Sequence, residues 1–209
     1  WSFFKTGNYY GADFCYRELP EVLDVWDNKT FEKDPTEFYS VCTDVETGLP
    51  HYQKLSKGSL DDIQWLRASA SVPIVSKIVE LEGGKYLDGG LSDEVPLKYF
   101  EDLGYEKNIV ILTNPVTHKE KFSPVLYFME KLFFNKYPNL LKTMKSIPER
   151  NTQSFLHIAE QEKNGNILVM RPKTELKIGA KAKDEAELDR IYELGRITAH
   201  ERLSEVKEF

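Results

Sequence analysis

One carboxylate in this sequence stands where it could act on a substrate. Asp88 follows Lys85-Tyr86-Leu87, which has the character of a strand, and precedes Gly89 and Gly90. Two glycines leave the carboxylate uncrowded and permit backbone angles that are closed to other residues. A carboxylate presented in this way suits a general base. The same residues also fit a plain Asp-Gly turn, so the surrounding segments must decide between the two interpretations.

Other polar residues have simpler structural explanations. Ser69 and Ser71 lie near a predicted helix end and lack the flanking glycines of a nucleophilic serine, so we assign them to packing or capping. Arg67 fits either an ion pair near the site or a structural salt bridge. We expect Asp44 to organise its own turn. No metal site is predicted, because the histidines lack ligand spacing: His51, His118, His157 and His200.

The elements around Asp88 follow from local signals. Residues 80–87 read as a hairpin that turns at Gly83-Gly84. Before it, Ser59 is the N-cap candidate of a helix that stops before Pro73. After it, Ser92 or Asp93 is expected to cap a helix with Pro96 in its first turn. The chemistry-bearing carboxylate therefore lies between a strand and a helix.

The remaining segments alternate between strand and helix. Residues 37–45, 51–55 and 167–170 read as strands, and the apolar run 108–112 is typical of a strand buried on both faces. Helices are predicted from near Pro20 and over these ranges: 120–134, 137–163 and 184–206. Such alternation predicts an α/β fold with a mostly parallel sheet. In such sheets chemistry gathers at the carboxyl ends of the strands.

Composition narrows the class of protein. The 209 residues suit one domain, and no run reaches the roughly 18 apolar residues of a membrane span. A net charge of −6 argues against nucleic acid as a partner. Cys15 and Cys42 form no disulfide framework and fit a reducing compartment. We therefore expect a cytoplasmic protein, which associates with a membrane at its surface if at all.

The candidate membrane contact is the segment 119–145. Residues 105–209 hold 18 Lys and Arg against 15 Asp and Glu, whereas residues 1–104 hold 10 against 19. Apolar residues share one helical face within the segment: Phe122, Val125, Leu126, Met129, Leu132 and Phe133. Lysines flank them, as in helices that lie on anionic lipid. The alternative is a helix whose apolar stripe packs on the sheet.

Several segments together resemble the patatin-like phospholipase family, most closely its bacterial subgroup of predicted esterases. Trp65-Leu66-Arg67-Ala68-Ser69-Ala70-Ser71-Val72-Pro73 resembles the small-residue helix that leads, through a hairpin, into the family's Asp-Gly-Gly. Thr43-Asp44-Val45-Glu46-Thr47-Gly48 resembles its Thr-Asp-x-x-Thr-Gly turn. Residues 108–115 resemble the core strand that follows. The resemblance covers nearly the whole chain.

The resemblance implies a three-layer α/β/α fold and a lipid acyl hydrolase without cofactors, acting on phospholipids or related acyl esters. The family uses a serine–aspartate dyad, in which a carboxylate deprotonates the serine directly. Carried over to this sequence, the catalytic carboxylate is Asp88, with Gly89 and Gly90 in the active-site loop.

The sequence departs from the family at the nucleophile. No Gly-x-Ser-x-Gly and no glycine-rich oxyanion loop occur in these residues. We expect a C-terminal portion that lacks the N-terminal strands and is inactive alone. Residues 1–209 then form one truncated patatin-like domain, with 174–209 as a C-terminal extension.

Two alternatives remain open at this point. The chain could be an inactive remnant that binds lipid or protein. It could also be a generic α/β domain in which Asp88 only makes a turn. Distance from any pocket would favour the latter.

Overall fold

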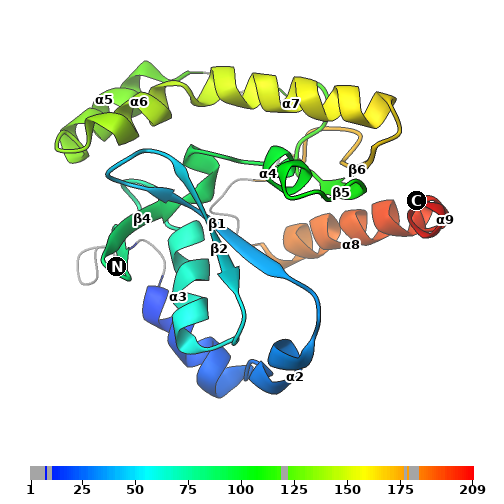
Figure 1. Cartoon of the computed structure of the whole chain (residues 1–209), viewed down its shortest axis with the longest axis horizontal. Coiled ribbons are helices and arrows are strands. Elements are labelled where there is room, and N and C mark those ends of the chain that lie inside the picture. The colour runs from blue at the N-terminus through cyan, green and yellow to red at the C-terminus, as the bar shows by residue number, and fades with distance from the viewer. Residues whose placement is uncertain (1–7, 9–10, 119–121, 177, 179–183) are drawn as a thin grey trace. The chain divides into compact units, whose positions relative to one another are not determined.

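The computed structural model describes residues 8, 11–118, 122–176, 178 and 184–209. The chain divides into two compact units. The first comprises residues 1–95 and 122–151, and the second comprises residues 96–121 and 152–209 (Figure 1). Each unit is described by itself.

The first unit is built on a four-stranded sheet with the order β2-β1-β4-β3. Its strands are β1 (Phe38–Asp44), β2 (Pro50–Leu55), β3 (Val79–Leu81) and β4 (Gly84–Asp88). Every neighbouring pair in it is antiparallel. Both predicted hairpins are confirmed, including the turn at Gly83, which has a φ of +81°.

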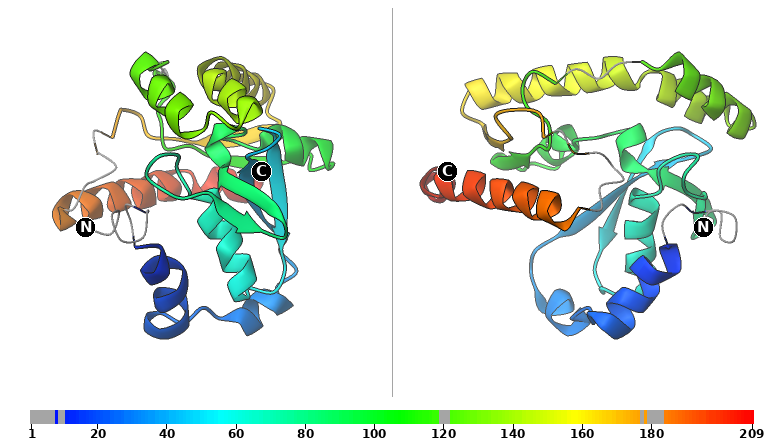
Figure 2. Two further views of the ribbon diagram at one scale, coloured as in Figure 1. Left: turned by 90° about the vertical axis from the view of Figure 1, so that its left-hand side faces the viewer. Right: turned by 180° about the vertical axis from the view of Figure 1, so that it is seen from behind.

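Helix α3 (Leu60–Ser69) covers one face of this sheet (Figure 1). Its start is as predicted, because the Ser59 hydroxyl accepts a hydrogen bond from the N–H of Asp62 at 3.4 Å. The side chains buried between helix and sheet include Cys42, Trp65 and Tyr86. The π-helix η1 (Phe14–Leu23) lies against α3, and the short α2 (Asn28–Lys33) follows it (Figure 2).

The opposite face of the sheet packs against α6 (Pro138–Lys145) and the segment before it, which follows α5 (Pro124–Phe133). Leu87 packs there with Leu140 and Met144, whereas its neighbour Tyr86 packs on the α3 side. Successive residues of a strand point to opposite faces, so β4 joins the two cores. Asp88 is the last residue of this strand, which has buried side chains on both of its faces.

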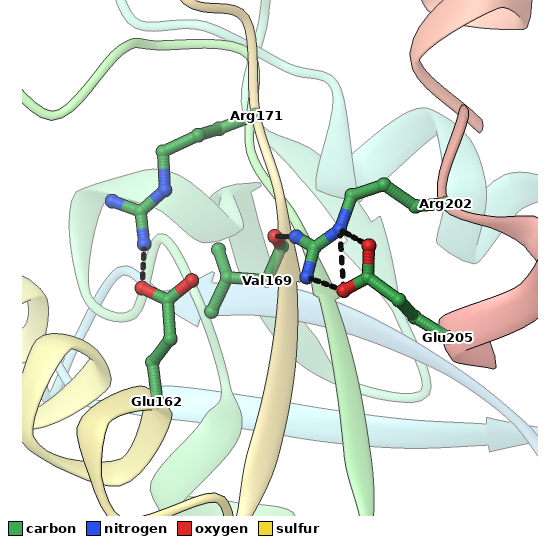
Figure 3. Close-up of polar contacts among 5 residues, drawn as sticks. All are labelled: Glu162, Val169, Arg171, Arg202 and Glu205. Carbon is green, nitrogen blue, oxygen red and sulfur yellow. Dashed lines mark hydrogen bonds and ion pairs between the residues drawn. The ribbon is translucent and has the colours of Figure 1, made fainter. Parts of the chain in front are cut away.

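The second unit contains the parallel pair β5 (Asn108–Ile111) and β6 (Ile167–Met170). Its helices are α4 (Leu97–Asp102), α8 (Glu185–Glu201) and α9 (Leu203–Glu208). The helix α7 (Ile147–Lys163) begins in the first unit and ends in the second. At the junction of α8 and α9, the Arg202 guanidinium donates to the backbone carbonyl of Val169 in β6 and pairs with Glu205 (Figure 3).

The mixed α/β class is confirmed, but the mostly parallel central sheet is not: among the described residues the larger sheet is antiparallel throughout. The short connections at residues 45–49 and 82–83 explain the pairs β1–β2 and β3–β4, because parallel neighbours need a crossover of a dozen or more residues. The run 108–112 is not buried on both faces either, since Ile109 is 45% and Ile111 75% exposed.

Several helix boundaries also differ from the predictions. The helix after Asp88 begins at Leu97 with Pro96 at its N-cap, so neither Ser92 nor Asp93 caps it. The predicted helix 137–163 is broken at Ser146, and the C-terminal one at Arg202. Among the described residues, no helix has the length and apolar character needed to cross a membrane.

Candidate functional site

The backbone of Asp88 is held by two segments that are distant in the sequence. Its N–H donates to the carbonyl of Ser71 at 3.0 Å, and its carbonyl accepts from the Thr43 hydroxyl at 2.7 Å. In the sheet, Asp88 pairs with Cys42 of β1. The position of the carboxylate is therefore set by the sheet and by the segment after α3.

The carboxylate itself is half-buried and has one occupied oxygen. Its Oδ1 accepts the N–H of Gly90 at 2.8 Å, while Oδ2 accepts no hydrogen bond from any residue that the structure describes. Burial raises the pKa of Asp88 above its usual value, and the Gly90 hydrogen bond opposes this in part. A carboxylate with raised proton affinity and an open oxygen can serve as a general base.

The two glycines are required by space rather than by unusual backbone angles, since neither has a positive φ. A Cβ on Gly89 would lie 2.3 Å from the carbonyl oxygen of Val41 in β1. A Cβ on Gly90 would lie 3.1 Å from Oδ1 of Asp88. The glycines let the loop pass directly against the sheet and let the carboxylate turn back onto its own loop.

A buried pair of hydroxyl groups lies next to this loop. The oxygens of Thr43 and Ser92 are 2.7 Å apart, and the Thr43 hydroxyl also bonds the Asp88 carbonyl. Ser92, which the sequence suggested as a helix cap, instead fastens the 3₁₀ turn η2 (Gly89–Leu91) to β1. Its buried and bonded hydroxyl supports the loop and does not face a substrate.

Tyr16 of η1 is a neighbour of Asp88 that the sequence did not indicate. Burial raises the pKa of Tyr16 most, and the charge of Cys15 adds to this effect. The charge of Arg67 opposes it, and the charge of Asp88 makes the smallest contribution in the raising direction. The phenol is therefore close enough to Asp88 to sense the charge of its carboxylate. No local pattern could have indicated it, because η1 reaches the site only through its packing on α3.

The remaining polar candidates have structural roles. Ser71 donates to the Arg67 carbonyl at 2.7 Å, as expected of a residue that ends a helix. Arg67 donates to Gln64 and forms no ion pair among the described residues. Asp44 accepts both the N–H and the hydroxyl of Thr47, which confirms that it organises its turn.

The two cysteines of this chain are free thiols. Burial raises the pKa of Cys42 to about 12, so its thiol stays protonated, and Cys15 is exposed and unpaired. His51 packs against the rings of Trp65 and Tyr86, which also contact each other. Within the described ranges, no group of histidine, cysteine and carboxylate side chains could hold a metal ion.

Two family models match this chain. Residues 6–101 match the patatin-like phospholipases, a stretch that contains all four strands of the first sheet and Asp88. Residues 137–209 match a domain of unknown function, DUF6363. The extension predicted from residue 174 falls inside this second stretch. No curated protein matches the sequence.

Proposed function

We propose, from the premise that residues 6–101 belong to the patatin-like phospholipase family, that this chain supplies the catalytic carboxylate of a lipid acyl hydrolase. The observation that carries the proposal is the state of Asp88. Its backbone is fixed at both ends, its pKa is raised by burial, and one of its oxygens accepts no hydrogen bond from the described residues.

In the proposed reaction, Asp88 and a serine hydroxyl form the catalytic pair. Asp88 takes the hydroxyl proton as the serine oxygen attacks the carbonyl carbon of an acyl ester. The tetrahedral intermediate expels the alcohol, which receives that proton from Asp88. Water then attacks the acyl-enzyme with Asp88 again as base, and the fatty acid and the free serine are released. The ester substrates that we propose are those of phospholipids or related lipids.

The serine of this pair is not provided by the described Ser71 or Ser92, whose hydroxyls are bonded in the protein. The sequence also has no Gly-x-Ser-x-Gly. We propose that the nucleophile and oxyanion donors come from outside these 209 residues, and that the chain alone is inactive. The strands that accompany them would complete a three-layer fold with a mostly parallel sheet, in which residues 1–209 belong to one domain with an extension from 174.

The pH dependence of hydrolysis tests the role of Asp88. Asp88 must be deprotonated to act, so kcat/KM should rise with pH through its raised pKa. In the complete, nucleophile-bearing protein, the acid limb should therefore have its midpoint above about 3.9, the ordinary Asp value. A pH profile with a soluble chromogenic acyl ester gives this midpoint. A midpoint at or below 3.9 contradicts the assignment of Asp88, whereas the absence of any hydrolysis by the complete protein favours a remnant that binds lipid without turnover.

We also propose that this chain docks on anionic lipid through residues 119–145, as a peripheral protein on the cytoplasmic side. What supports this is the exposure of the apolar face of α5: Val125 is 72%, Leu132 62% and Phe133 61% exposed, whereas Glu130 is buried. Lysines accompany the face on α5, on α6 and between them. Exposed apolar side chains beside cations suit a helix at a lipid surface. Residues 119–121 lie outside the described residues.

Vesicle binding should depend on these lysines. Replacing Lys131, Lys136, Lys142 and Lys145 with glutamine should weaken binding to vesicles of phosphatidylserine and phosphatidylcholine at least tenfold, because each cation near such a surface contributes about 1 kcal/mol. Co-sedimentation with the vesicles measures this binding. The matched control replaces four exposed lysines elsewhere in the same unit: Lys29, Lys33, Lys57 and Lys77. Equal loss in both variants would mean that only net charge matters, and the α5 surface would be rejected.

A further inference from the structure

The second unit contains an apolar pocket that the proposed reaction does not use. Its volume is about 290 Å³, and it lies between the strands β5 and β6 and the helix α8. Leu112 and Met170 line it from the strands, and Leu194 lines it from the helix. All of these residues belong to the same compact unit.

The pocket lies at the carboxyl ends of two parallel strands. Both β5 and β6 end where its lining begins, and the ladder continues one step further through the N–H of Leu112 and the carbonyl of Met170, 2.8 Å apart. In sheets of parallel strands, ligands bind at this end, because the chain leaves each strand there and opens a crevice. The place in the fold is therefore one that suits a small ligand.

The helix side of the pocket has small residues. Gly195 lies in the interior of the 17-residue helix α8, where glycine is less favourable than any residue except proline. Its φ is not positive, and a Cβ added to it would meet no atom within 4 Å. Neither backbone conformation nor close packing therefore calls for glycine. Together with Ala199, one turn later, it leaves space free along the helix side of the pocket.

Arg171 places a cation at the edge of this apolar space. It follows β6, lines the pocket and has a side chain that is only 16% exposed. One nitrogen, Nη2, donates to Glu162 at 2.6 Å, while Nε and Nη1 bond no acceptor in the described part of the chain. Figure 3 shows this pair on one side of β6 and the pair of Arg202 and Glu205 on the other. Glu162 accepts one of the five N–H groups of the guanidinium, so four N–H groups remain for an anion.

We propose that this pocket binds a medium-length fatty acid, with the chain in the apolar space and the carboxylate at Arg171. The apolar lining selects a hydrocarbon chain, and a guanidinium recognises a carboxylate through paired N–H donors. The volume is roughly twice the about 150 Å³ that admits benzene, and it lies at the lower end of ligand pockets. It therefore suits a single short chain and not a whole phospholipid. The proposal rests on the second unit and does not require Asp88 to be catalytic.

Calorimetric titration of the full chain with sodium decanoate, below its aggregation concentration, tests the proposal. Decanoate should bind, and Gly195→Phe or Ala199→Phe should weaken it at least tenfold by filling the pocket. Tyr192→Ala is the matched control, because Tyr192 lies on the same helix, is 67% exposed and does not line the pocket. Absence of decanoate binding, or equal affinity in all of these proteins, overturns the proposal.

The role of Arg171 in binding the carboxylate is tested separately, by replacing Arg171 and by comparing decanoate with an uncharged ligand. Arg171→Met should weaken decanoate at least fivefold but leave 1-decanol binding unchanged, and Arg171→Lys should restore part of the loss. Retained decanol binding shows that the pocket is still folded. If Arg171→Met binds decanoate as the original chain does, the carboxylate assignment is wrong. Asp88→Asn should bind decanoate normally, which separates this result from the fate of the proposed hydrolase.

Discussion

Asp88→Asn is expected to lower kcat/KM for an acyl ester by about 10²–10⁴-fold in the complete, nucleophile-bearing protein. Asparagine keeps an oxygen that can accept the Gly90 N–H, which lies 2.8 Å from Oδ1, but it cannot take a proton from a serine. Initial rates with a soluble chromogenic ester, away from any lipid surface, measure this effect. The surface of α5 then plays no part in the result.

Asp44→Asn is the matched control. Asp44 also ends a strand of the same sheet and is half-buried, but its carboxylate organises the turn at Thr47. It should change kcat/KM by less than about threefold, because it loses no proton-transfer group. The 209-residue chain assayed alone should show no turnover. Near-normal turnover by Asp88→Asn would remove Asp88 from the catalytic role.

Asp88→Asn should lower activity but raise the stability of the folded chain. Burial raises the folded-state pKa of Asp88 above the unfolded value of about 3.9, so the folded state favours the protonated form. This contribution is complete below the unfolded pKa and is lost as the pH rises through the folded pKa. Asp88→Asn should therefore melt at a higher temperature than the original chain at pH 7. Below about pH 3.9 the difference should disappear.

Gly89→Ala is expected to destabilise the first unit by about 3 kcal/mol. The added Cβ would lie 2.3 Å from the carbonyl oxygen of Val41, a backbone atom of the central strand β1 that cannot rotate away. Forcing a methyl group into a packed interior typically costs about 1–3 kcal/mol, and more where the neighbour is rigid. Urea unfolding followed by fluorescence and circular dichroism gives the free energy.

Gly195→Ala is the control for the added methyl group. Its Cβ meets nothing within 4 Å, so it should stabilise helix α8 by about 0.5–1 kcal/mol. If Gly89→Ala unfolds at the same urea concentration as the original chain, the loop does not lie against β1 as described. The spatial requirement for Gly89 would then be wrong.

Much of the first sheet could be predicted because its signals are local. The alternation in residues 38–44 and the turn at Gly83 lie within a few residues of the structures that they specify. Ser59 likewise marks the start of α3 through a bond only three residues away. Pairing direction is different, because it depends on which strands become neighbours. An apolar run such as 108–112 predicts a strand but not how many of its faces are covered.

The residues of the site likewise divide into those with local sequence signals and those placed only by packing. Asp88 and its two glycines could be identified from their order in the sequence, and the structure describes their geometry without testing their role. Tyr16 could not be identified, because η1 lies more than 60 residues before β4 and reaches the site only by packing. The apolar residues of α5 were equally ambiguous: periodicity indicates a face, whereas only the neighbouring elements determine whether that face is covered.

The bonds that hold Asp88 also determine when its environment can form during folding. Thr43 precedes Asp88 by 45 residues, and Ser71 belongs to a third segment. Bringing such remote segments together costs chain entropy before any contact repays it, so structures of this kind assemble slowly and late. A peptide cut around residues 85–90 would therefore have an ordinary, solvated aspartate. The perturbed carboxylate exists only once the intact sheet has been assembled.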